Sequence, residues 1–100
     1  MNKSQPGVVL KMRAKPGMGD ALFELTTSLH YTDNPDLPVD WFLCRADDDP
    51  DVLWALEFYK DGESFARHFS DPDVDHTHDK VFELLAEPPL RVEVHPVAFS

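Results

Sequence analysis

The chain has 100 residues, with 9 Lys or Arg and 19 Asp or Glu, so its formal net charge is −10. This length suits a single domain, which we expect to span residues 1–100. A negative field repels phosphates and anionic lipid headgroups, which excludes nucleic acid and membrane surfaces as expected partners. No apolar run approaches the roughly 18 residues of a membrane span, and the N-terminal segment lacks the apolar core of a signal peptide. We therefore expect a cytoplasmic protein.

Two strands and a helix are predicted in the first half of the chain. Residues 8–14 alternate as a strand, and leucines then recur at helical spacing over 19–31. Prolines break this helix before a second strand over 39–46, and the acidic stretch 47–51 predicts a solvated hairpin loop. The single cysteine, Cys44, excludes an intrachain disulfide and lies in an apolar run, where we expect a buried packing residue.

The third predicted strand, over 52–59, is largely apolar on both parities. A strand with one face in water should alternate, so this strand is expected to be covered on both faces. The helices of a chain this short can cover only one face, and a second copy is the economical cover for the other. We assign Trp54 and Phe58 to the helix-facing parity, with Phe42 of the preceding strand and Phe82 on the same side, and Ala55 to the parity that faces the partner.

Two helices and a strand are predicted in the second half. Asp61 can cap a helix over 62–70, which a proline ends, and a second helix is predicted over 73–86. His78 lies in the apolar stripe of that second helix. Two consecutive prolines separate it from a last strand over 90–99.

The predicted order, β-α-β-β-α-α-β, makes the last two helices one broken crossover. This is the split βαβ arrangement of the α+β ferredoxin-like fold. Its four-stranded antiparallel sheet carries helices on one face only. The open face is the one for which a second subunit is expected, so the sequence predicts a homodimer.

Three segments carry a family resemblance. They are Arg-Ala-Lys-Pro-Gly at 13–17, Leu-Glu-Phe-Tyr at 56–59 and Ser-Phe-Ala-Arg-His-Phe-Ser-Asp-Pro at 64–72. In this order and spacing they resemble the antibiotic biosynthesis monooxygenase (ABM) family of the dimeric α/β-barrel superfamily. The resemblance implies a pocket between helices and sheet in each subunit. Many members of the family use this pocket to oxidise aromatic polycyclic or quinol compounds with O2, without flavin, haem or metal.

That chemistry needs a base with a pKa near neutrality and an apolar pocket that holds the substrate anion and O2 together. His68 and His78 are the candidate bases, and no cofactor is expected. Partly buried structural histidines and plain core aromatics are the alternative interpretation. The expected substrate-binding residues are the aromatic side chains Phe42, Trp54, Phe58, Tyr59 and Phe82.

Glu57 is the acidic residue of the third strand. It shares a parity with Tyr59, and we expect it to face the same way as Lys11 and Arg13. We therefore interpret it as a structural ion-pair residue at the subunit interface, with a catalytic role as the alternative.

Metal sites are not expected. An EF-hand starting at Asp71 would need Gly at its sixth position and Glu at its twelfth, where this chain has His76 and Phe82. His76 and His78 are two residues apart on a helix and so point in different directions, with His76 toward solvent.

Two other function classes stay open. The haem-degrading branch of the superfamily resembles this fold and uses a helix histidine, whose position falls on His78. Tyr59 stands where that branch has tryptophan, and Leu10 where it has asparagine. A non-catalytic dimer that binds a small ligand or serves in stress responses is the third interpretation.

Overall fold

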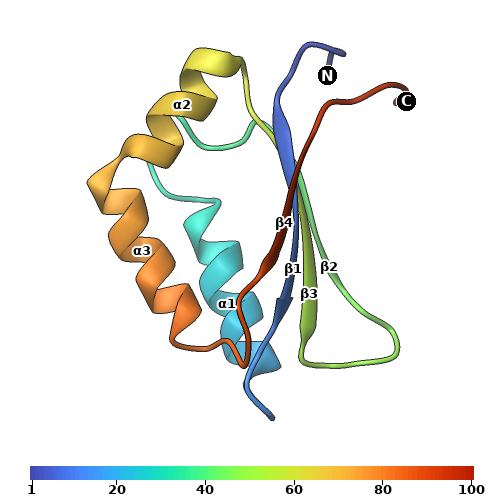
Figure 1. The fold of residues 1–100 in the computed structure, drawn as a ribbon, viewed down its shortest axis with the longest axis vertical. Helices are drawn as coiled ribbons and strands as arrows, with labels where there is room; N and C mark the ends of the chain where they lie inside the picture. Colours follow the sequence, from blue (N-terminus) through green and yellow to red (C-terminus); the bar gives the residue numbers. More distant parts are fainter.

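Three helices lie against one face of a four-stranded antiparallel sheet in the computed structural model, which describes residues 1–100 (Figure 1). The predicted α+β ferredoxin-like order is confirmed. None of the helices has the length and apolar character needed to span a bilayer. The elements are β1 (Gly7–Arg13), α1 (Gly19–Leu29), β2 (Asp40–Arg45), β3 (Val52–Phe58), α2 (Gly62–Ser70), α3 (Pro72–Phe82) and β4 (Leu90–Val94).

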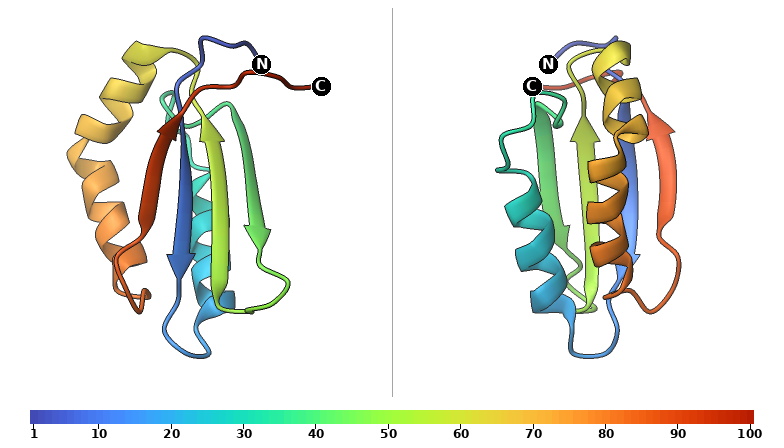
Figure 2. Two further views of the ribbon diagram at one scale, coloured as in Figure 1. Left: turned by 45° about the vertical axis from the view of Figure 1, so that its right-hand side comes forward. Right: turned by 90° about the vertical axis from the view of Figure 1, so that its left-hand side faces the viewer.

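The strand order across the sheet is β2-β3-β1-β4, and every pair is antiparallel. Strands β1 and β3 are therefore central. All three helices lie on the same side, so the sheet has one covered face and one open face (Figure 2).

Side-chain caps fix the start of the second and third helices. The Asp61 carboxylate accepts a hydrogen bond from the Ser64 backbone N–H at 2.8 Å, as predicted for the start of α2. Asp71 caps α3 in the same way, through the Asp73 N–H at 2.9 Å. Pro72 begins α3, because the first helical position needs no N–H donor.

Helix α3 ends at Phe82, four residues before its predicted end. The reason is a backbone contact with the end of β1. The Lys15 N–H donates to the Leu84 carbonyl at 2.8 Å, and the Ala86 N–H donates to the Arg13 carbonyl at 2.9 Å. These hydrogen bonds take the 84–86 backbone out of the helix. Strand β4 is also shorter than predicted, and it ends at Val94.

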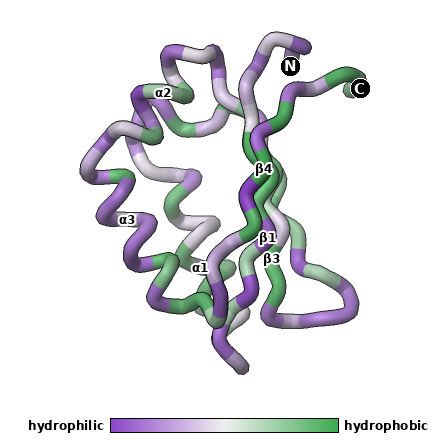
Figure 3. Tube along the Cα trace, viewed as in Figure 1, coloured by the Kyte–Doolittle hydropathy of each residue, from purple (hydrophilic) through white to green (hydrophobic).

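The core lies between the helices and one parity of the central strands. Met12 pairs with Leu53, and Leu10 pairs with Ala55, so these four side chains face the helices. Helix α3 is largely hydrophilic (Figure 3). Its two buried residues, Val74 and Val81, lie on the side that faces the sheet. Ala55 is 1% exposed. Its predicted orientation toward a partner subunit is therefore wrong.

The open face carries the other parity of β3, which holds its largest apolar side chains. Trp54 pairs with Lys11 and with Cys44, and Lys11 lies 5.5 Å from the centre of the Trp54 ring. Cys44 is exposed, so its predicted burial is wrong. The helix-facing orientation predicted for three aromatic residues is also wrong, because cross-strand pairing places them on the open face. They are Phe42, Trp54 and Phe58.

Gly19 gives a test of the packing at the start of α1. A Cβ there would lie 2.3 Å from the Pro50 carbonyl oxygen. Gly19→Ala should therefore lower the free energy of unfolding by about 1–3 kcal/mol, the usual cost of overpacking, as measured by urea denaturation. The control is Gly62→Ala, where no atom lies within 4 Å and stability should be kept or increased. Wild-type stability in Gly19→Ala would contradict the close approach.

Candidate active site

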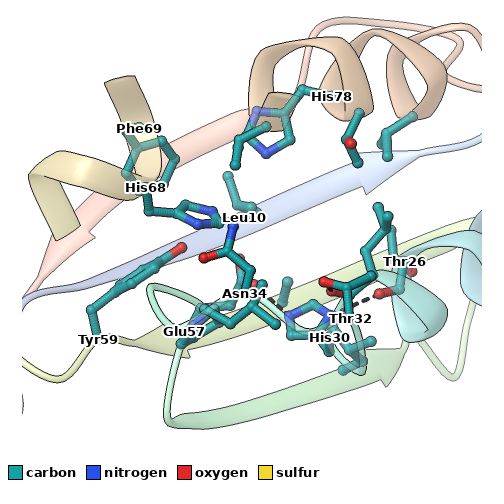
Figure 4. A pocket seen from close by; sticks show the side chains of 18 of the residues that line it. Leu10, Thr26, His30, Thr32, Asn34, Glu57, Tyr59, His68, Phe69 and His78 are labelled. Carbon is teal, nitrogen blue, oxygen red and sulfur yellow. Dashed lines mark hydrogen bonds and ion pairs between the residues drawn. The ribbon is translucent and has the colours of Figure 1, made fainter. Parts of the chain in front are cut away.

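A cavity of about 490 Å³ lies between the helices and the covered face of the sheet (Figure 4). This volume falls within the range of about 300–1,000 Å³ that is typical of small-molecule sites. All four strands and all three helices contribute to its wall. Apolar residues on the wall include Leu10, Met12, Leu29, Leu43 and Val81. Its titratable residues include His30, Glu57, Tyr59, His68, His78 and Arg91.

The structure brings together five of the site residues singled out in the sequence. Glu57, Tyr59, His68, His78 and Phe82 all line the cavity. Phe42, Trp54 and Phe58 do not line it, because they lie on the opposite face of the sheet. The aromatic wall of the site is therefore formed largely by helix residues and Tyr59.

Glu57 is buried on the helix-facing side, where it contacts His30. The His30 Nε2 lies 2.5 Å from the Glu57 Oε2, and the His30 Nδ1 lies 2.7 Å from the Thr26 carbonyl oxygen (Figure 4). A carbonyl oxygen only accepts hydrogen bonds, so Nδ1 carries a proton. The second ring nitrogen then shares a further proton with the Glu57 carboxyl group.

Glu57 does not lie at the open face of the sheet, so its predicted role at the subunit interface is wrong. Glu57 pairs with Val8 across β1, and both face the helices. Lys11 and Arg13 belong to the other parity of β1, so they lie on the opposite side of the sheet from Glu57.

His30 was not predicted as a site residue. It follows the last turn of α1, where backbone carbonyls have no helical partner, and its imidazole satisfies the carbonyl of Thr26. A histidine cation is also favoured at a helix C-terminus. The Trp41 ring packs on it at 4.5 Å between ring centres. The available signal was the four-residue spacing of Leu22, Thr26 and His30, which places them on one helix face.

Two opposing effects act on the pKa of His30. Burial lowers it, but the hydrogen bond to Glu57, the hydrogen bond to Thr26 and the Glu57 charge together raise it by more, so the net value lies above the ordinary 6.5. His30 therefore keeps its proton to a higher pH than an ordinary histidine does.

The pKa of His68 is shifted in the opposite direction to that of His30. It is 7% exposed, and its Nδ1 is buried without a hydrogen-bond partner. Its ring packs 5.1 Å from Tyr59 and 5.0 Å from Phe69. Burial lowers the pKa of His68, the Glu57 charge partly offsets this, and the charge of His78 adds to the lowering. The imidazole is therefore neutral at pH 7, with one nitrogen able to accept a proton.

Tyr59 stands beside His68 and is 1% exposed. Burial and then the negative charge of Glu57 raise the pKa of Tyr59, so its hydroxyl stays protonated throughout the neutral range. The cavity thus combines a neutral base, a protonated phenol and a carboxyl group that shares a proton.

Metal ligation is not favoured by this arrangement of side chains. No group of three or more His, Cys, Asp or Glu is placed to hold a metal ion. His76 is exposed, as predicted, while His78 lines the cavity.

Comparison with known proteins places the chain in a family. Residues 7–80 match the family model described as antibiotic biosynthesis monooxygenase. The chain belongs to this family. The family's description names a monooxygenase activity, and the match does not specify a substrate. The comparison with curated proteins gives no match.

Solved structures share the fold over nearly the whole chain. A Chloroflexus aurantiacus protein, provisionally described as an antibiotic biosynthesis monooxygenase, is 27% identical with a TM-score of 0.77, and 97% of each chain is covered. A Nitrosomonas europaea protein with the same provisional description is 19% identical, with a TM-score of 0.80 and coverage of 97% of this chain and 94% of that chain. A Shewanella oneidensis protein is 24% identical, with a TM-score of 0.77 and coverage of 95% and 93%. The last two support the fold alone.

The opposite protonation of the two histidines can be measured directly. An NMR titration of the imidazole signals should place the pKa of His30 above 6.5 and that of His68 below 6.5. Glu57→Gln should lower the pKa of His30, because the variant removes the charge and the shared proton. A His30 pKa unchanged by the substitution would contradict the pairing.

Proton binding by His30 also has a consequence for stability. Its pKa is raised on folding, so its contribution to the free energy of unfolding is complete below pH 6.5 and is lost as pH rises through the higher folded value. The stability advantage of the wild type over Glu57→Gln should therefore decrease as pH rises through that value, in urea denaturation at a series of pH values.

Proposed function

We propose that this protein is a cofactor-independent monooxygenase that oxidises a phenol- or quinol-type aromatic compound with O2, and that His68 is its general base. The observation that carries the proposal is the neutral, buried His68, whose Nδ1 has no partner, in the wall of a cavity with largely apolar surroundings. Family membership supports the reaction class.

The reaction begins with removal of a proton. His68 takes the hydroxyl proton of the aromatic compound, and the resulting anion transfers one electron to O2. Recombination of the two radicals forms a C–O bond and a peroxide anion. Loss of water then leaves a ketone. For a substrate whose keto form has a reactive methylene carbon, the methylene group and one O2 give one ketone carbonyl and one water, so no external reductant is needed.

His68 is favoured over His78 as the base for two reasons. His68 is the more buried of the two, and its ring contacts Tyr59, whose protonated hydroxyl can donate a hydrogen bond to the phenolate oxygen of the substrate. Phe82 is 49% exposed and also lines the cavity, so it supplies an aromatic contact at the mouth. The apolar wall excludes water and holds the anion near O2.

Oxygen uptake with a panel of dihydroxyaromatics, naphthols and anthrones tests this proposal. His68→Ala should lower the rate by about 10²- to 10⁴-fold, the usual contribution of a general base. His76→Ala is the matched control, since His76 is exposed on α3 and does not line the cavity. It should keep the wild-type rate.

The outcomes test the assignment of the base and separate the oxygenase from a non-catalytic protein. A wild-type rate in folded His68→Ala would contradict the assignment of the base. Tight binding of panel compounds without oxygen uptake would favour a non-catalytic ligand-binding protein. Circular dichroism of each variant distinguishes loss of activity from loss of folding.

We also infer that a second copy covers the open face of the sheet. Its apolar residues include Phe42, 61% exposed, and Val92, 48% exposed, beside Leu56. An apolar face of this kind indicates a protein interface. Sedimentation equilibrium should therefore give about twice 11.4 kDa.

Phe42→Glu should convert the dimer into a monomer, because it places a charge in the apolar face without touching the cavity. The control is Met18→Glu, which changes an exposed apolar side chain outside the sheet. A monomeric wild type, or an intact dimer in Phe42→Glu, would contradict the interface.

A further inference from the structure

We propose that Glu57, paired with His30, is a second proton-transfer site of the cavity and donates the proton that allows the peroxide intermediate to break down. The proposal rests on the monooxygenase reaction proposed above. It assigns Glu57 as a catalytic residue and His30 as a positioning residue.

The hydrogen bonds of His30 determine which member of the pair can reach a ligand. Its Nδ1 donates to the Thr26 carbonyl at 2.7 Å, and its Nε2 lies 2.5 Å from the Glu57 Oε2. Both ring nitrogens are therefore engaged, and the imidazole has no free N–H. Glu57 uses only Oε2 in this contact, and the shared proton can move from the His30 Nε2 onto this oxygen. Rotation of the carboxyl group about its Cγ–Cδ bond then presents the protonated oxygen to a molecule in the cavity that Glu57 lines.

The position of the pair is fixed from two sides. His30 is held by the C-terminal turn of α1, and the Trp41 ring from β2 packs on it. Glu57 is fixed on β3, two residues before Tyr59. A carboxyl group held in this way is preorganised to donate a proton at one place.

The two histidines differ in their hydrogen bonds, and their pKa values shift in opposite directions. The hydrogen bonds of His30 to Glu57 and Thr26 outweigh burial and raise its pKa, while burial lowers the pKa of His68, whose Nδ1 has no partner. The other titratable groups that line the cavity near these sites are Tyr59 on β3, His78 on α3 and Arg91 on β4. We assign the acceptor role to His68 and the donor role to the pair of Glu57 and His30.

The reaction requires both a proton acceptor and a proton donor. After His68 has taken the hydroxyl proton and the C–O bond has formed, the distal oxygen of the peroxide anion needs a proton. The Glu57 pair supplies this proton and forms the hydroperoxide. The remaining C–H bond on the oxygenated carbon then breaks, its electron pair forms the C=O bond, and the O–O bond breaks.

The protons that His68 and Glu57 exchange during this step are all accounted for within the cavity. The departing hydroxide takes the proton held by His68 and leaves as water. The proton from the C–H bond returns to Glu57. Both sites are then in their starting states, and the products are the ketone and water.

Without the donor, only the proton on His68 and the Tyr59 hydroxyl could protonate the peroxide anion, and the anion should be protonated more slowly. It can then dissociate again into the substrate radical and superoxide. Two substrate radicals couple to a dimer, and two superoxide ions take up the two protons released by the substrate hydroxyls to give H2O2 and O2. Loss of the donor should therefore separate oxygen consumption from ketone formation.

The test uses Glu57→Gln, which keeps the size of the side chain and removes the shared proton. O2 consumed, ketone formed and H2O2 released are measured together, with a panel compound that the wild type oxidises. Ketone formation should fall by about 10²- to 10⁴-fold, the range for loss of an acid–base group, while O2 consumption falls less and H2O2 accumulates. His30→Gln should shift the product ratio in the same direction.

Glu63→Gln is the matched control, because Glu63 is exposed on α2 and does not line the cavity. It should keep the wild-type ratio of ketone to O2. If Glu57→Gln does not fold, His30→Gln carries the test alone.

Two outcomes would count against these proposals, and they can be told apart. A wild-type ratio of ketone to O2 in both folded variants, with or without a lower rate, overturns the proton-donor role and leaves the oxygenase intact. Absence of oxygen uptake in the wild type overturns the oxygenase itself, and the peroxide step with it.

Discussion

The contact between Glu57 and His30 is the constraint on which the site depends. Burying a carboxylate on the helix-facing side of a sheet is costly unless it is paired and hydrogen-bonded. His30 satisfies this requirement at 2.5 Å, and it also caps a free carbonyl of α1. The His30 side chain thus joins the end of α1 to the central strand β3. This contact allows a carboxyl group to be buried in the cavity wall of a small fold.

The same constraint explains how two histidines in one cavity differ. His30 gains a carboxylate partner and a carbonyl partner, so it retains its proton. His68 gains neither and is surrounded by Tyr59 and Phe69, so it loses its proton more readily. Opposed shifts of this kind in one cavity are typical of acid–base sites. The proposed oxygenase uses the second histidine as base, and the proposed proton donor depends on the first.

The sequence was sufficient to predict the order of elements, because caps, prolines and spacing act locally. Asp61 and the 62–70 helix are examples. The inward parity of β3 was not predictable in this way. Periodicity separates its residues into two sets without showing which set faces the helices, and the set with Trp54 was wrongly assigned to the helix-facing side. The helix-facing set contains the small Ala55 and the polar Glu57, whose burial depends on a partner 27 residues away in sequence.

The central claim is that the cavity takes up the hydroxyl proton of an aromatic ligand on His68. An anaerobic absorbance titration with a chromogenic nitrophenol measures this step without any oxygenation. The bound nitrophenol should change to the coloured phenolate at a lower pH in the wild type than in His68→Ala, because His68 accepts its proton. The same ionisation pH for the ligand bound to both folded proteins would contradict the proton uptake by His68.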